Sequence, residues 1–185
     1  MKGNSQMDNG ASSYRQYLDG DDLAFEQIVK DYRESLVFFI LGIVNDFNAA
    51  EDIAIDVFAD LAVNHRYNFK VSLKTYLFMV GRSRAIDYIR KRNRHQVVEL
   101  SESEPYLNDG NSLENEYLAD LRRRELHKAI SGLPEKMRTA VYLVYFEDLT
   151  YEDTAKVMKL SKKQVDNLLY RAKAKLRSIL LEKGI

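Results

Sequence analysis

The sequence predicts an all-α protein built from two small helical domains that a flexible acidic linker joins. The first observation is composition: glycine and proline are scarce, at 8 and 2 of 185 residues, which disfavours a β fold with many turns. The second is periodicity, because apolar residues recur at the three- and four-residue spacing of amphipathic helices. The third is a polar stretch after residue 94, where this spacing lapses. A chain of this length suits one ordinary domain or two small ones.

Residues 1–20 are polar and are expected to form a disordered N-terminus. They lack the apolar core of a signal peptide. The longest apolar run, residues 36–44, is far shorter than the roughly 20 residues that span a bilayer. The absence of cysteine excludes disulfides and thiolate metal sites. We therefore expect a cytoplasmic protein that does not insert into membranes.

The first domain is expected to span residues 21–94 and to contain three helices. Residues 22–44 carry an apolar stripe and predict the first helix. Asn48, with Glu51 three residues later, is a candidate N-cap for the second helix. Ser72 is a candidate cap for the third, which is expected to end near residue 92.

The linker and the second domain are expected to follow this bundle. Residues 95–113 collect Pro, Gly, Asn, Ser and carboxylates, which is typical of a flexible acidic linker. Residues 114–185 predict a second, smaller bundle. In this bundle Gly132 ends one helix, and Pro134 can occupy the first turn of the next.

The last two predicted helices suggest a DNA-binding helix-turn-helix. Thr150 caps the first, and Ser161 with Gln164 forms a capping box at the second. The chain has 28 basic and 28 acidic residues, yet residues 156–177 hold eight cations and a single carboxylate, Asp166. Such a basic helix can enter the major groove, although a solvated helix hairpin would show the same charges. The candidate DNA contacts are Ser161, Lys162, Lys163, Asp166, Asn167, Tyr170, Arg171 and Lys173.

An acidic stripe marks the second predicted helix. Asp52, Asp56 and Asp60 are four residues apart and share one helix face, where each like-charged pair costs about 0.2–0.5 kcal/mol. One interpretation is a docking face for a basic partner. The other is that Asp52 complements the helix N-terminus while the remaining two carboxylates are solvated. The sequence leaves both interpretations open.

The segment RYNFK, residues 66–70, combines aromatic rings with cations. This combination suits binding of unpaired nucleic-acid bases, but packing of Tyr67 and Phe69 on the bundle explains it as well. An enzyme is not expected, because the three histidines lack metal-ligand spacing and no glycine-rich phosphate loop is present. The sequence therefore predicts neither a cofactor nor a metal site.

Three longer segments carry a resemblance to a known family. In chain order they are AAEDIAIDVFADL, SLKTYLFMVGRSRAIDYIRKRNR and GLPEKMRTAVYLVYFEDLTYEDTAKVMKLSKKQVDNLLYRAKAKLRSIL. The first is similar to an AEDLVQEVF helix, and the second to a WLYRIARNLALDYLRRR segment. Both belong to conserved region 2 of the extracytoplasmic-function group of bacterial RNA polymerase sigma factors. The third segment resembles region 4 of the same group, and the order and the acidic linker agree.

This resemblance implies a role for each charged cluster. Region 2 is expected to dock on core RNA polymerase and to open the −10 promoter element, and region 4 to bind the −35 element. The residues implied for polymerase docking are Glu51, Asp52, Ile55, Asp56 and Asp60. Those implied for the −10 element are Arg66, Tyr67, Asn68, Phe69, Lys70, Arg82, Arg84 and Arg90. An anti-sigma factor is a further expected partner. The rival interpretation is an autonomous helix-turn-helix regulator that binds duplex DNA without polymerase.

Four positions depart from the family pattern. Ile55 stands where glutamine is frequent, and Gly81 stands where alanine is usual within a helix. Lys159 replaces the typical turn glycine, and Asp166 lies where a basic residue is common. Because exposed recognition residues vary, the promoter sequence does not follow from the resemblance.

Overall fold

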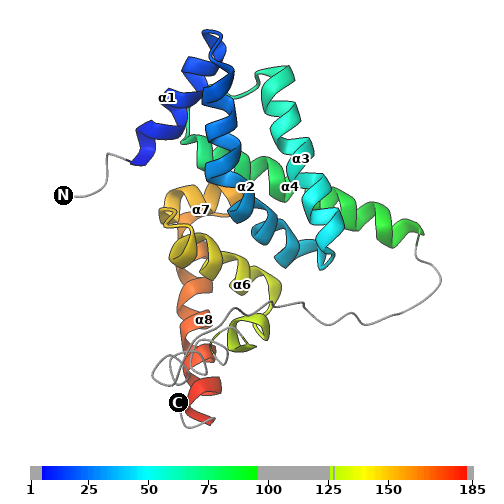
Figure 1. The fold of residues 1–185 in the computed structure, drawn as a ribbon. Helices are drawn as coiled ribbons and strands as arrows, with labels where there is room; N and C mark the ends of the chain where they lie inside the picture. The colour runs from blue at the N-terminus through cyan, green and yellow to red at the C-terminus, as the bar shows by residue number, and fades with distance from the viewer. Residues whose placement is uncertain (1–5, 96–125, 127, 183–185) are drawn as a thin grey trace, which may run out of the picture.

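The computed structural model describes residues 6–95, 126 and 128–182, and Figure 1 shows that their ordered elements are helices. These elements are α1 (Gln6–Leu18), α2 (Asp22–Val44), α3 (Phe47–Asn64), α4 (Leu73–His95), α6 (Glu135–Val141), the π-helical turn η1 (Tyr142–Phe146), α7 (Tyr151–Met158) and α8 (Lys162–Glu182). No strand occurs in the described ranges, and the all-α prediction is confirmed. The predicted linker beyond His95 and most of the helix expected after it lie outside the described residues.

Helix α1 corrects the expectation that residues 1–20 are disordered. The helix is anchored by Tyr14, which is fully buried, and by Tyr17, which packs against the core. The Tyr14 hydroxyl donates to the carbonyl oxygen of Leu61 at 3.0 Å, and the Tyr17 hydroxyl donates to that of Ala62 at 3.3 Å. Two aromatic anchors in a polar segment are too few to produce a recognisable stripe, so periodicity missed this helix.

The caps of the next helices follow the sequence with one exception. Helix α2 has the bounds that its apolar stripe predicts. Helix α3 begins earlier than expected, because the Asp46 side chain, and not that of Asn48, accepts the hydrogen bond from the Ala49 amide at 3.0 Å. Ser72 caps α4 as predicted, with its hydroxyl accepting from the Thr75 amide at 3.0 Å.

Helices α2, α3 and α4 bury their apolar faces against one another, with α1 packed mainly on α2. Leu36, Ile40 and Phe78 are among the most buried side chains at this junction. Gly81 shows why α4 departs from the family pattern: a Cβ at this position would lie 2.9 Å from Leu36 Cδ1. The absence of a side chain therefore allows the Leu36 side chain to approach α4 closely.

The C-terminal bundle contains the predicted helix-turn-helix. Thr150 caps α7, and Ser161 and Gln164 form the predicted capping box at α8, with bonds of 2.8 and 3.2 Å. Lys159 ends α7 in the left-handed conformation, with φ 55°, which explains why glycine is typical at this turn. Pro134 lies at the N-cap of α6, one residue before the first turn.

The two bundles contact each other. Figure 1 shows α7 beneath α2 and α4, and α7 packs on α4 while α6 packs on α2. The buried apolar residues of both bundles form one continuous cluster. The sequence predicted two domains but did not predict this contact between them.

Candidate nucleic-acid and polymerase interfaces

Helix α8 presents the predicted recognition residues on one exposed face. Val165, Leu169 and Ala172 are buried on its other side, and this fixes the rotation of the helix. All eight candidates are consequently exposed, including Tyr170 with 76% of its surface accessible. The structure thus brings together Ser161, Lys162, Lys163, Asp166, Asn167, Tyr170, Arg171 and Lys173.

Two of the cations on this face contact the rest of the bundle. Lys162 Nζ hydrogen-bonds to Glu152 Oε1 of α7, and this bond raises the pKa of Lys162. Lys173 Nζ lies 5.4 Å from the ring centroid of Tyr145, and hydrogen bonding to the Tyr145 hydroxyl raises the pKa of this lysine. The Lys163 side chain makes no hydrogen bond or ion pair within the described part of the chain. It is therefore freer than Lys162 to reach an external ligand.

The acidic stripe on α3 is partly neutralised by a cation from α4. One Arg84 guanidinium nitrogen lies 3.6 Å from an Asp56 carboxylate oxygen, and the other lies 3.6 Å from an oxygen of Asp60. Glu51 is paired with Arg33 of α2 at 2.7 Å. Arg84 was expected to track DNA, but in this structure its charge offsets the repulsion between two stripe carboxylates.

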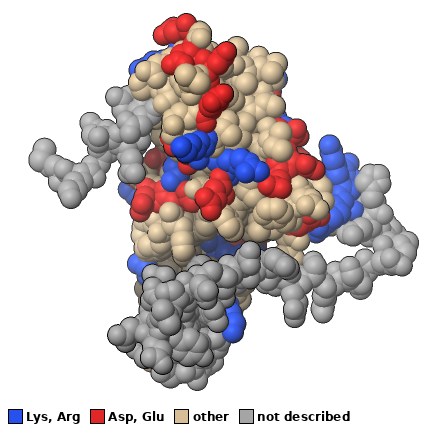
Figure 2. Space-filling view, in the orientation of Figure 1, with Lys and Arg blue, Asp and Glu red and all other residues tan. Residues whose placement is uncertain are grey.

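The outer side of α3 combines charge with apolar surface. Asp52 and Asp56 are exposed, and Ile55 between them is 55% exposed. Figure 2 shows that acidic and basic side chains lie next to one another on the face in view, without separating into large patches. An exposed aliphatic side chain between two carboxylates suits contact with a partner surface that is basic and partly apolar.

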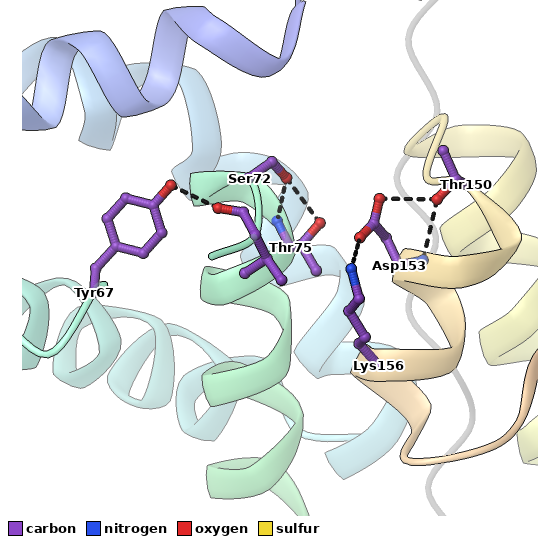
Figure 3. Close-up of polar contacts among 7 residues, drawn as sticks. Tyr67, Ser72, Thr75, Thr150, Asp153 and Lys156 are labelled. Carbon is purple, nitrogen blue, oxygen red and sulfur yellow. Dashed lines mark hydrogen bonds and ion pairs between the residues drawn. The ribbon is translucent and has the colours of Figure 1, made fainter. Parts of the chain in front are cut away.

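The loop before α4 separates its two aromatic residues. Tyr67 is only 4% exposed, and its hydroxyl donates to the Val71 carbonyl oxygen at 2.7 Å (Figure 3). Phe69 is 36% exposed and has φ 61°, a conformation unusual for a bulky residue. Tyr67 therefore packs in the core, as one of the two interpretations of this segment expects. The accessible members of the segment are Arg66, Asn68, Phe69 and Lys70.

Arg15 of α1 lies against this loop and was not identified from the sequence as a candidate site residue. The Arg15 guanidinium carbon lies 4.9 Å from the Phe69 ring centroid, which is within the range of a cation–π contact. The Phe69 ring also lies beside the rings of Tyr14 and Tyr67, at centroid distances of 5.9 and 4.7 Å. No signal marked Arg15, because it lies in the segment that was expected to be disordered.

The other two arginines of α4 that were expected to contact DNA, Arg82 and Arg90, differ in their surroundings. Arg82 is half-buried, its Nε atom has no hydrogen-bond partner among the described residues, and burial lowers its pKa. Arg90 is exposed and lies 3.4 Å from Asp87 on its own helix. The structure therefore does not gather Arg82, Arg84 and Arg90 into a single free basic surface.

The described ranges hold neither a candidate metal site nor a candidate membrane span. No group of three or more His, Cys, Asp or Glu side chains could hold a metal ion there. No helix in those ranges combines the length and apolar character needed to cross a membrane.

Comparisons with known proteins agree with the resemblance seen in the sequence. Residues 28–95 match the family model Sigma-70 region 2, and residues 123–176 match Sigma-70, region 4. The RNA polymerase sigma-H factor of Pseudomonas aeruginosa is 30% identical over 164 residues, which cover 83% of this chain and 84% of that protein. The ECF RNA polymerase sigma factor SigM of Bacillus subtilis is 25% identical over 162 residues, which cover 85% and 95% of the two chains.

Solved structures show the same fold. The sigma factor RpoE from Bartonella quintana, solved in complex with the anti-sigma factor NepR, aligns with a TM-score of 0.66 and 22% identity. The alignment covers 84% of this chain and 96% of that one. CnrH, solved in complex with the cytosolic domain of CnrY, aligns with a TM-score of 0.61 and 18% identity over 94% and 96% of the two chains.

Proposed function

The chain belongs to the extracytoplasmic-function group of RNA polymerase sigma factors, and from this premise we propose which of its residues contact core polymerase and which contact promoter DNA. A sigma factor is a transcription initiation factor, which binds core RNA polymerase and promoter DNA. We propose that this chain has no catalytic activity of its own and acts in the cytoplasm together with the polymerase.

The proposed polymerase contact is the outer face of α3. Asp52 and Ile55 are its central residues, because both are exposed and neither side chain has a hydrogen bond or ion pair within the described part of the chain. Asp56 is also exposed, although it shares Arg84 with Asp60. Glu51 and Asp60 are assigned to the edge of the contact, since each already has a cationic neighbour. A basic partner surface could displace Arg84 from Asp56 at little cost, because a surface ion pair contributes about 0–1 kcal/mol.

The proposed −10 contact is the accessible part of residues 66–70. Asn68 and Phe69 offer an amide and a ring edge to an unstacked base, and Arg66 and Lys70 offer charge to phosphates. We assign Tyr67 a supporting role, because its buried hydroxyl already donates to the loop backbone. Arg84 and Arg90 would follow the DNA backbone only after their carboxylate contacts have opened.

The proposed −35 contact is the exposed face of α8. Its first turns follow the Ser161 cap, which is the part of a recognition helix that reaches base edges. Lys163 and Asn167 are assigned to bases, while Arg171 lies further along the helix and is assigned to phosphate. The observation that carries this assignment is the exposure of all eight candidates opposite a buried apolar stripe.

Binding to core polymerase tests the proposal against an autonomous DNA-binding regulator. Asp52→Lys should weaken binding to purified core enzyme at least tenfold without changing the melting temperature. Glu26→Lys is the matched control, because Glu26 is an exposed carboxylate on α2 outside the proposed contact. Equal core affinity for the two variants would remove α3 from the contact. Tight binding to duplex DNA without polymerase would support the autonomous regulator.

An anti-sigma factor is a proposed partner. Support comes from RpoE, which was solved in complex with the anti-sigma factor NepR. RpoE has a similar fold, and its alignment covers most of this chain. We extend to this protein only the kind of partner, since 22% identity indicates a shared fold and not a shared interface.

A further inference from the structure

The loop before α4 holds Phe69 in an unusual backbone conformation. Phe69 has φ 61°, in the left-handed region that a bulky residue rarely adopts. Its ring lies beside the rings of Tyr14 and Tyr67, with centroid distances of 5.9 and 4.7 Å, yet 36% of the residue stays exposed. Strained conformations persist only where the surrounding structure holds them, and they are concentrated at functional sites such as ligand clamps. Phe69 is therefore held at the surface in a way that suits contact with a ligand.

Helix α1 supplies a cation to the same place. The Arg15 guanidinium carbon lies 4.9 Å from the Phe69 ring centroid, so the guanidinium covers part of the ring. The preceding residue, Tyr14, is buried and bonded to the Leu61 carbonyl oxygen, which fixes α1 beside the loop. Arg15 is exposed, and its side chain makes no hydrogen bond within the described residues. Because a guanidinium has five N–H donors, donors remain available to an external acceptor.

The charge of Arg15 is not neutralised by a neighbouring carboxylate. Within the described part of the chain, no Asp or Glu side chain lies within ion-pair distance of Arg15, or of Arg66 and Lys70 in the loop. A cation of α4 provides the contrast, since Lys74 Nζ lies 2.8 Å from Glu147 Oε2. Three cations without carboxylate partners therefore come from α1 and the adjoining loop. Such cations attract the phosphates of nucleic acid.

We propose that Arg15 is a further −10 contact of this chain, in which the guanidinium rests on the Phe69 ring and binds a backbone phosphate beside the extruded base. This contact rests on the proposed assignment of residues 66–70 to the −10 element. Arginine suits the double role, because its planar group can keep one face on a ring while its edge donates two hydrogen bonds to phosphate oxygens. Phosphates occur at every sequence, so Arg15 contributes to affinity for the unpaired −10 strand and not to the choice of bases.

Neutralisation of single phosphates tests the contact. The probe is promoter DNA that the unsubstituted protein, assembled with core polymerase, selects from a randomised library, prepared with the −10 element unpaired. Methylphosphonate groups then replace one phosphate at a time next to the extruded base. One replacement should weaken binding of the unsubstituted holoenzyme several-fold and should not affect the Arg15→Gln holoenzyme, which lacks the partner of that phosphate. If every replacement weakens the two holoenzymes equally, Arg15 contacts no phosphate and the proposal is overturned.

Salt dependence provides an independent measurement. On the unmodified probe, Arg15→Gln should weaken binding several-fold and reduce the slope of log affinity against log salt by about 0.7, the value for one phosphate contact on a single strand. Arg15→Lys should keep the slope but bind less tightly, because an ammonium group cannot form the paired hydrogen bonds. An unchanged slope for Arg15→Gln would limit Arg15 to supporting the loop and would overturn the phosphate contact.

Lys30→Gln is the matched control for the loss of one positive charge. Lys30 is an exposed cation on α2 and lies outside the proposed contacts. Its substitution should change neither the affinity nor the salt slope. If Lys30→Gln reduces both as much as Arg15→Gln does, the effect belongs to the net charge of the protein and the specific contact is overturned.

The role of the ring is tested by combining substitutions. Phe69→Leu keeps an apolar side chain but removes the surface on which the guanidinium rests. In the Phe69→Leu background, Arg15→Gln should therefore cost less affinity for the unpaired probe than it does in the unsubstituted chain. Additive losses would show that the ring does not position Arg15, and would overturn that part of the proposal.

Asn68→Ala separates this contact from the assignment on which it rests. Slower open-complex formation with Asn68→Ala, together with unchanged probe binding by Arg15→Gln, would overturn the Arg15 contact and leave the loop assignment in place. Unchanged behaviour of both variants would remove the loop assignment as well. Losses with both variants would support both.

Discussion

The Tyr14 hydroxyl donates a hydrogen bond to the Leu61 carbonyl oxygen, 3.0 Å away, and this contact ties α1 to the last turn of α3. The Tyr14 ring also meets the Tyr67 ring edge-on, with a centroid distance of 5.5 Å. Helix α1 thus supports the loop that we assign to the −10 element. A helix absent from the predicted domain therefore contributes both to stability and to the position of a candidate site.

Tyr14→Phe should reduce the free energy of unfolding by about 1–2 kcal/mol, because it keeps the ring but removes the buried hydrogen bond to Leu61 and the 3.3 Å hydrogen bond between the hydroxyl and His65 Nδ1. Tyr17→Phe is the control, since its bond to Ala62 is longer, at 3.3 Å, and only partly buried. It should cost less than Tyr14→Phe. Urea denaturation followed by circular dichroism measures both values, and an equal or larger loss for Tyr17→Phe would contradict the anchoring role of Tyr14.

Stability should fall at alkaline pH. Burial raises the pKa of Tyr14 to about 12, from an ordinary value near 10. The unfolded chain therefore loses this proton at lower pH than the folded chain. The stability contributed by the neutral phenol is intact below pH 10 and is lost as pH rises towards 12. Urea midpoints between pH 8 and pH 11.5 should decline less steeply for Tyr14→Phe. Tyr170→Phe, at an exposed position, should leave the decline unchanged.

The sequence predicted those parts of the fold that local signals determine. The bounds of α2, the Ser72 cap and the Ser161–Gln164 capping box are confirmed because each depends on residues within a few positions of one another. The same reasoning misplaced the start of α3, where Asp46 and Asn48 are both good caps and only the geometry of the turn selects between them.

Contacts between distant residues could not be predicted in this way. Nothing in the spacing of residues 66–70 shows that Tyr67 is buried against α1 while Phe69 remains accessible. Likewise, Lys74 and Glu147 are 73 positions apart, and their pairing depends on how two bundles pack. The sequence grouped candidate site residues by helix face, which the structure supports for α8, but it could not show which cations already have an intramolecular carboxylate.

Lys159→Gly should stabilise the helix-turn-helix by about 0.5–1 kcal/mol. Lys159 has φ 55°, and a left-handed conformation strains a residue with a Cβ atom but not glycine. The gain is limited because glycine also increases the entropy of the unfolded chain. Ala174→Gly, at an exposed position within α8, should instead cost about 1 kcal/mol. Thermal unfolding compares the two, and destabilisation by Lys159→Gly would show that the turn has no such strain.

In the loop of residues 66–70, supporting residues and base-contacting residues should respond differently to substitution. Tyr67→Phe removes the hydrogen bond to Val71 and should lower the melting temperature with similar effects on duplex and pre-melted promoters. Asn68→Ala changes an exposed side chain and should instead slow open-complex formation on duplex DNA more than on a template already melted at the −10 element. Equal losses on both templates for Asn68→Ala would argue against contact with an extruded base.

The exposed face of α8 should divide into residues that read sequence and residues that hold phosphate. Lys163→Ala and Asn167→Ala lie in the first turns of α8 and should change which −35 sequences are preferred, at about 1–3 kcal/mol for each lost base contact. Arg171→Ala should weaken all promoters alike and reduce the slope of binding against salt by about one. Transcription by reconstituted polymerase from a library of −35 sequences distinguishes these effects.

Asp166 provides the sharpest test of this assignment, because it is an exposed carboxylate among cations. A carboxylate repels phosphate and can accept a hydrogen bond from cytosine, so Asp166 should either select a base or limit nonspecific binding. Asp166→Lys should therefore raise affinity for random DNA and reduce the preference among −35 sequences, whereas Asp166→Asn should keep the shape of the side chain and show a smaller gain. If the library profile is the same for the unsubstituted chain and for the changes at Lys163, Asp166 and Asn167, α8 does not enter the major groove and the −35 assignment loses its mechanism.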